Sequence, residues 1–158
     1  VCSGNTCRSP MAEAIARKII ADRMNVSPDR LLEQCGISVL SAGSFAMTGS
    51  PATPQGVAAL QSLGIDLSHH RSQLLTVGLI NQADVIFAMG QDHRSAVLAL
   101  VPSAADKTMT LDPRGDIDDP IGGNVTLYRE LAGALEKMIT ERLNDTIWAD
   151  EAVRENRR

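Results

Sequence analysis

The sequence predicts an α/β fold in which a short, doubly wound parallel sheet carries helices on both faces. Residues 85–89 form an unbroken apolar run, which is typical of a central parallel strand that is covered on both faces. Several longer segments instead repeat their apolar residues at helical spacing. A polar loop at residues 2–8 leads directly into the first of these helices, and such loops bind ligands in open parallel sheets.

The first half of the chain provides one long helix and one strand. Ser9 suits an N-cap and Pro10 suits the first helical position, so we expect a helix over about residues 9–24. Residues 37–41, Ile-Ser-Val-Leu-Ser, are followed by Ala-Gly, which predicts a strand that ends there.

The second half alternates helices with shorter extended segments. Thr53 suits an N-cap and Pro54 suits the first helical position, which predicts a helix that starts there. The apolar residues of segment 91–100 recur at helical spacing and predict another helix. Residues 107–111 are suited to a short edge strand, and Asn124 can cap the last main helix. The buried stripe of that helix should consist of Leu127, Leu131, Leu135, Met138, Ile139 and Leu143.

Composition limits the class of protein. A chain of 158 residues with 44% hydrophobic residues suits a single domain with its own core. It contains no apolar run of transmembrane length, and its net charge of −4 argues against nucleic acid as a partner. Three cysteines do not make a disulfide framework, so a reducing cytoplasm is the expected location.

Cys2 and Arg8 enclose a loop with the features of an anion site. Gly4 and Asn5 tolerate positive φ, and the loop opens onto a helix N-terminus whose free N–H groups attract anions. These surroundings favour the thiolate of Cys2, and Arg8 offers two donors that match a phosphate group. The simpler alternative is a buried structural cysteine before an ordinary capped helix.

Residues 2–10 resemble the signature loop of the low-molecular-weight protein tyrosine phosphatases. Further segments follow in that family's order, so the resemblance covers residues 1–143 and leaves residues 144–158 as a C-terminal extension, either a docked short helix or a loose tail. It implies a phosphatase I-like fold with about four strands, and the family's first strand would lie upstream of Val1. The matching residues are Cys2, Ser3, Gly4, Asn5, Thr6, Cys7, Arg8, Ser9 and Pro10.

The resemblance also implies a reaction through a phosphocysteine intermediate, without metal or other cofactor. Cys2 would be the nucleophile and Arg8 the transition-state clamp, while Asp119, which directly precedes Pro120, would act as acid and then as base. Asp116 and Asp118 fit a solvated turn better. Phosphate would be held by Arg8 and by the backbone N–H groups of Ser3, Gly4, Asn5, Thr6 and Cys7.

Two further side chains would support this loop. Ser9 would shape the loop and stabilise the thiolate. By the resemblance, His69 would hydrogen-bond Asn5, whereas His70 is expected at the surface.

The residues that would select the substrate point away from phosphotyrosine. Tyrosine-directed relatives generally carry aromatic residues just after the Asp-Pro pair, where this chain has residues 121–123, Ile-Gly-Gly. Thr6 resembles the bacterial protein-arginine phosphatases, in which this hydroxyl helps to recognise the phosphoguanidinium, although it could also serve only as loop support. Phe45 is either a pocket wall or merely a partly covered loop residue. We therefore expect phosphoarginine ahead of phosphotyrosine.

Cys7 lies in the same curved loop as Cys2, so the two thiols could form a protective disulfide on oxidation, or Cys7 could simply pack beneath the loop. A thioredoxin-coupled arsenate reductase would need further cysteines downstream, and none follows Cys35. A non-catalytic phosphate-binding module is the other alternative.

We expect a monomer that acts on a phosphorylated protein, is inhibited by phosphate or vanadate, and binds neither nucleic acid nor membrane.

Overall fold

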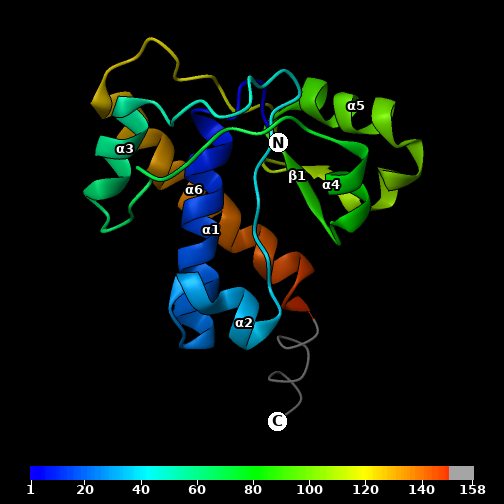
Figure 1. The fold of residues 1–158 in the computed structure, drawn as a ribbon, viewed down its shortest axis with the longest axis horizontal. Helices are drawn as coiled ribbons and strands as arrows, with labels where there is room; N and C mark the ends of the chain where they lie inside the picture. Colours follow the sequence, from blue (N-terminus) through cyan, green and yellow to red (C-terminus); the bar gives the residue numbers. More distant parts are fainter. Residues whose placement is uncertain (150–158) are drawn as a thin grey trace.

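The computed structural model describes residues 1–149 (Figure 1). The predicted α/β class is confirmed, because helices surround a small parallel sheet. In chain order the elements are α1 (Arg8–Met24), η1 (Pro28–Arg30), α2 (Leu31–Cys35), α3 (Pro54–Gln61), α4 (Val77–Gln82), β1 (Ile86–Ala88), α5 (Gln91–Leu100), η2 (Pro102–Lys107), β2 (Thr108–Thr110) and α6 (Val125–Thr146).

The sheet is parallel throughout. Strand β1 pairs with β2, and isolated parallel bridges join Cys2 to Gly43 and Gly43 to Leu74. The Met89 N–H donates to the Val1 carbonyl at 2.9 Å, which connects the two sets of pairings. The loop of residues 2–8 therefore starts in the middle of a row of parallel segments. In the β1–β2 register, Ile86, Phe87 and Ala88 lie beside Thr108, Met109 and Thr110.

The extended segment before residue 42 differs from the prediction. Residues 37–41 are not a strand, and two strands rather than about four are formed within the part of the chain that the structure describes. The reason is that the backbone hydrogen bonds to neighbouring segments come from residues 42–45, as in Ala42 O with Cys2 N at 3.2 Å. A strand needs a ladder of consecutive pairs, and a single bridge does not make one.

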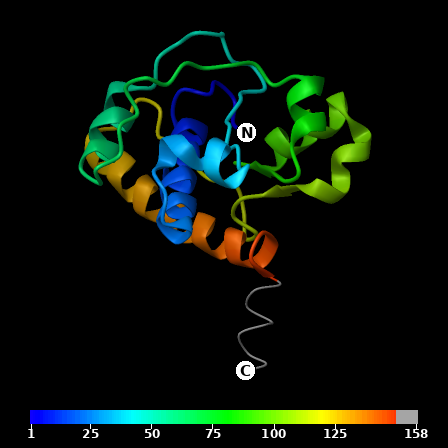
Figure 2. The ribbon, with the colours of Figure 1, turned by 60° about the horizontal axis from the view of Figure 1, so that its bottom comes forward.

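Helices cover both faces of the sheet, as a doubly wound fold requires. On one side α1 packs along α6, and α3 packs on α6 as well (Figures 1 and 2). On the other side lie α4 and α5. The alternation along β1 matches this arrangement, because Phe87 packs with the core of α1 and α6 whereas Ile86 packs with Ile80 and Val97 of α4 and α5.

Most predicted helix ends are confirmed. The Thr53 hydroxyl caps α3 by accepting from the Gly56 N–H at 3.3 Å, and Asn124 caps α6 by accepting from the Leu127 N–H at 3.0 Å. Leu127, predicted to be buried, is 44% exposed, because the buried face of α6 begins at Tyr128 and continues one turn later at Ala132.

The helix α6 continues three residues past residue 143, to Thr146, and Trp148 is buried in the main core. The Arg23 guanidinium lies 4.0 Å from the centre of the Trp148 ring. The first part of the predicted extension is therefore packed on the domain, and the remainder, residues 150–158, lies outside the described residues. Over residues 1–149, none of the helices has the length and apolar character needed to cross a membrane.

Candidate active site

The loop of residues 2–8 connects the centre of the sheet to α1, and its curvature depends on close backbone contacts. Asn5 has φ of 54°, in the left-handed region. Gly43 lies directly against the loop, since a Cβ there would be 2.4 Å from the Ser3 carbonyl oxygen. The N–H groups of Ser44 and Phe45 donate to the carbonyls of Cys2 and Ser3 at 2.9 and 3.0 Å. The loop's carbonyls are thus turned outward to the neighbouring segment.

Asn5 is the hub of the loop. Its fully buried side chain donates through Nδ2 to the hydroxyls of Ser9 and Ser41, at 2.9 and 2.8 Å. Its Oδ1 accepts from the Gln73 N–H at 2.8 Å. The Ser41 hydroxyl donates in turn to Glu13 Oε2 at 2.6 Å. Every polar atom of the Asn5 side chain is used, which fixes the left-handed turn.

The histidine that contacts this loop is His70, and the prediction for His69 is wrong. His70 Nε2 lies 2.7 Å from the Asn5 carbonyl oxygen. His69 is exposed, and its Nε2 lies 3.6 Å from Asp66. The His70 N–H closes a turn onto the Leu67 carbonyl at 3.2 Å, and adjacent side chains in a turn point in different directions, so only one of the two histidines faces the loop.

The Cys2 thiol is buried, 2% exposed, and receives hydrogen bonds from the loop. The Asn5 N–H donates to Cys2 Sγ at 3.3 Å, and the Ser9 hydroxyl lies 3.0 Å from the same sulfur. The helix α1 begins at Arg8, one residue before the predicted N-cap, because the Ser9 hydroxyl is engaged by Cys2 and Asn5 and does not cap the helix. Donors aimed at sulfur stabilise its anionic form.

Arg8 and Asp119 are brought together although 111 residues separate them. Arg8 Nη2 donates to Asp119 Oδ2 at 2.7 Å, and Nη1 donates to the Ile117 carbonyl at 2.8 Å. The guanidinium is almost fully buried, whereas the Asp119 carboxylate is 40% exposed at the surface of the site. The structure thus places a fixed cation in the loop and an accessible carboxylate over it.

Asp116 was predicted to belong to a solvated turn, but its carboxylate contacts the start of α5. Its Oδ1 accepts from the Gln91 N–H at 2.9 Å, at the start of α5. The carboxylate lies so close to Gly90 that a Cβ there would be 2.7 Å from Asp116 Cγ. Asp116 therefore holds the loop of residues 116–119 against the N-terminus of α5.

A hollow of about 310 Å³ opens beside the loop. Phe45 is among the residues that line it, and this residue is 85% exposed. The lining consists of Ser3, Arg8, Ser44, Phe45, Met89, Gly90, Asp92, His93 and Asp116.

Thr6 and Cys7 do not line this hollow. The Thr6 hydroxyl is half-buried and 3.8 Å from Cys7 Sγ. Cys7 Sγ is 3.4 Å from the hydroxyl of Tyr128, which comes from the first turn of α6. Burial, and then the hydrogen bond to Cys7, raise the pKa of Tyr128 to about 12. All three cysteines are free thiols.

Sequence reasoning missed several residues of the site. Four of them were given no role: Tyr128, His93, Gln73 and Glu13. A buried polar residue in an amphipathic helix is the one signal that could have identified His93, since it lies on the buried side of α5 together with Val97, one turn later.

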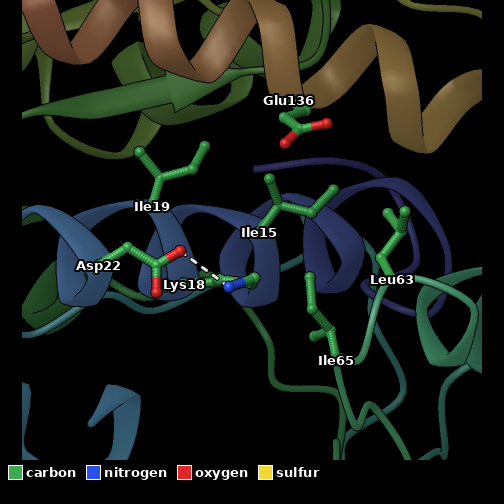
Figure 3. Close-up of a pocket in the computed structure, with 7 residues that line it drawn as sticks. All are labelled: Ile15, Lys18, Ile19, Asp22, Leu63, Ile65 and Glu136. Atoms are coloured by element: carbon green, nitrogen blue, oxygen red, sulfur yellow. Dashed lines mark hydrogen bonds and ion pairs between the residues drawn. The ribbon is translucent and has the colours of Figure 1, made fainter. Parts of the chain in front are cut away.

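A second hollow, of about 120 Å³, lies between α1, α6 and the segment after α3 (Figure 3). It is lined mainly by aliphatic side chains, and its Lys18 and Asp22 pair with each other at 2.8 Å. Over the described part of the chain, no cluster of three or more His, Cys, Asp or Glu side chains could hold a metal ion. Of these two hollows, the larger one lies beside the Cys2 loop and is lined by Arg8 from that loop.

Comparisons with known proteins agree with this geometry. The family model described as low molecular weight phosphotyrosine protein phosphatase matches residues 1–157. The protein-arginine-phosphatase of Bacillus subtilis is 38% identical over 146 residues, covering 89% of this chain and 90% of its own. A probable low molecular weight protein-tyrosine-phosphatase, EpsP of Ralstonia solanacearum, is 35% identical and covers 87% and 86%.

Among solved structures, a mutant of the YwlE arginine phosphatase with a phosphorylated active-site serine superimposes with a TM-score of 0.75. It is 35% identical, and the match covers 92% of this chain and 93% of that one. With a family model matched over nearly the whole chain, and with the fold and phosphate loop described above, this chain belongs to the low molecular weight phosphotyrosine protein phosphatase family and is a protein phosphatase.

Proposed function

We propose that the chain hydrolyses phosphorylated arginine side chains of proteins in preference to phosphotyrosine, through a phosphocysteine on Cys2. The observation that carries the catalytic part is the joint position of three groups: a buried thiol with two donors, a fixed guanidinium and an accessible carboxylate. The family membership and the names of the two arginine-phosphatase relatives support it.

In the first step Cys2 Sγ attacks phosphorus, so that a sulfur–phosphorus bond forms as the bond to the leaving nitrogen breaks. For this step Asp119 is protonated and released from its ion pair with Arg8, and from the exposed side of the site it gives its proton to that nitrogen. Arg8 and the loop N–H groups hold the equatorial oxygens, and Arg8 keeps its orientation through the Ile117 carbonyl.

In the second step water attacks the phosphocysteine. The Asp119 carboxylate now takes the water's proton, the sulfur–phosphorus bond breaks, and phosphate and the Cys2 thiolate are released. The Asn5 N–H and the Ser9 hydroxyl stabilise this leaving thiolate.

The substrate preference rests on Thr6 and on the composition of the rim. Thr6 contributes a hydroxyl whose contact with Cys7 Sγ, at 3.8 Å, is a long one, so it can turn toward a guanidinium nitrogen. The residues after Pro120 are Ile121, Gly122 and Gly123, which offer no aromatic ring for a phenyl group to stack on.

The test is phosphate release from matched phosphoarginine and phosphotyrosine peptides by the wild type, Thr6→Ile and Cys2→Ser. We expect the wild type to favour phosphoarginine and Thr6→Ile to lower the ratio of the two kcat/KM values at least ~10-fold, because a lost polar contact changes specificity strongly. Thr140→Ile, at an exposed position of α6, is the matched control and should leave the ratio unchanged.

A wild type that prefers phosphotyrosine would refute the substrate assignment while leaving the mechanism intact. Turnover by Cys2→Ser would refute the mechanism itself. We further propose that the chain works as a monomer in the cytoplasm. We also propose that phosphate and vanadate compete with the substrate for the loop, which kinetic measurements at several inhibitor concentrations would show as competitive inhibition.

A further inference from the structure

His93 is a buried histidine that touches the phosphate loop from outside it. It comes from the first turn of α5, is 9% exposed, and its Nε2 lies 2.8 Å from the hydroxyl of Ser3, the residue that follows the nucleophile. Both side chains line the hollow beside Arg8. The pair joins positions 90 residues apart in the sequence.

The environment of His93 favours a neutral ring. Burial, and then the positive charge of Arg8, lower the pKa of His93 below its ordinary value. The carboxylates of Asp92 and Asp116 oppose this shift.

The position of the ring proton follows from the other nitrogen. Nδ1 of His93 is buried and has no hydrogen-bond partner among residues 1–149. A buried N–H without an acceptor is rarer and more costly than an unused acceptor lone pair, so the proton belongs on Nε2. Nε2–H therefore donates to Ser3 Oγ, and the Ser3 hydroxyl proton must point elsewhere.

We propose that His93 is a positioning residue for this reaction: it holds the Ser3 side chain so that its hydroxyl donates to the phosphoryl group in the loop. The helix that carries the ring is held at its start, because Asp116 accepts from the Gln91 N–H and packs against Gly90. The loop that carries Asp119 and the helix that carries His93 are thereby joined, and Ser3 supplies one donor beyond the backbone N–H groups. The proposal rests on the phosphocysteine mechanism above.

A double-mutant cycle tests it, with kcat/KM for phosphoarginine peptide and the inhibition constant of vanadate as readouts. We expect Ser3→Ala and His93→Ala each to lower kcat/KM and to raise the inhibition constant of vanadate about tenfold. The double variant should show the same kcat/KM and inhibition constant as either single variant, because both substitutions remove the same hydrogen bond. His93→Gln, which keeps a side-chain N–H donor, should recover most of the loss. The exposed histidine provides the matched control, and His69→Ala should match the wild type.

Additive losses in the double variant, or a Ser3→Ala variant with wild-type constants, would overturn the proposal. Nitrogen-15 NMR of the wild-type ring gives an answer that does not depend on any variant's folding: a proton on Nε2 supports the assignment, and a proton on Nδ1 or a doubly protonated ring at pH 7 contradicts it. An inactive wild type, or an active Cys2→Ser, would instead contradict the mechanism on which the proposal rests.

Discussion

Replacing Asn5 by glycine should show how much of the stability of the domain is held in the phosphate loop. Asn5 has φ of 54°, which glycine adopts without strain, so the substitution removes side-chain contacts and leaves the backbone conformation accessible. The lost contacts are the three hydrogen bonds to Ser9, Ser41 and the Gln73 N–H. At about 1 kcal/mol for each buried bond, the free energy of unfolding should fall by about 3 kcal/mol.

Asn25 provides the matched control. It has φ of 55° at the C-cap of α1 and is exposed, so Asn25→Gly changes the same residue type at the same backbone angle without buried contacts. Its stability should stay within about 0.5 kcal/mol of the wild type. Urea denaturation of the three proteins measures both values, and the Asn5 variant should also melt roughly 6–12 °C lower.

Catalysis should fall together with stability, because the Asn5 N–H and Ser9 both contact Cys2. We expect kcat/KM of Asn5→Gly toward p-nitrophenyl phosphate to drop at least ~10-fold at a temperature where the variant is folded. An Asn5 variant as stable as the wild type, or a loss of the same size in Asn25→Gly, would refute the reasoning.

Three other perturbations follow from the same contacts. Gly43→Ala should reduce kcat/KM more than ~10-fold, because the new Cβ would lie 2.4 Å from the Ser3 carbonyl oxygen. Gly133→Ala has open space around the new Cβ and should raise the free energy of unfolding in urea by about 0.5–1 kcal/mol. Equal changes in kcat/KM, or equal changes in the free energy of unfolding, for the two variants would contradict this. Tyr128→Phe removes the hydroxyl that contacts Cys7 and should cost about 1 kcal/mol in urea denaturation, and an unchanged midpoint would show that the contact is not stabilising. Because the pKa of His93 is lowered on folding, the unfolded chain binds a proton more readily than the folded chain below about pH 6.5. The free energy of unfolding should therefore decrease as the pH is lowered below that value, and His93→Gln should flatten this dependence. Equal slopes for the two proteins in urea denaturation at several pH values would argue against a buried neutral ring.

The parts of the molecule that were predicted correctly are those encoded by neighbouring residues. The caps of α3 and α6 came from Thr53 and Asn124, whose side chains bond N–H groups three residues ahead. The apolar run at residues 85–89 marked β1, because a strand buried on both faces leaves no polar alternation.

The errors occurred where neighbouring residues compete for one position. His69 and His70 have the same chemistry, and the turn closed on the Leu67 carbonyl decides which ring reaches Asn5. Ser9 is a good N-cap by type, but the sulfur of Cys2 and the amide of Asn5 take its hydroxyl. The segment at residues 37–41 contains β-branched residues that suit a strand, yet it lacks the consecutive backbone partners that would make it one.

By itself, the sequence determined the chemistry of the loop, because residues 2–10 are contiguous and their backbone preferences, donors and nucleophile act over a few ångströms. Only the tertiary structure decided which distant groups meet that loop: Asp119 on Arg8, Tyr128 on Cys7 and His93 on Ser3. Such contacts depend on how helices and loops from separate parts of the chain pack around the sheet. That packing decides which side chains point at the loop, and the residues next to them in the sequence do not.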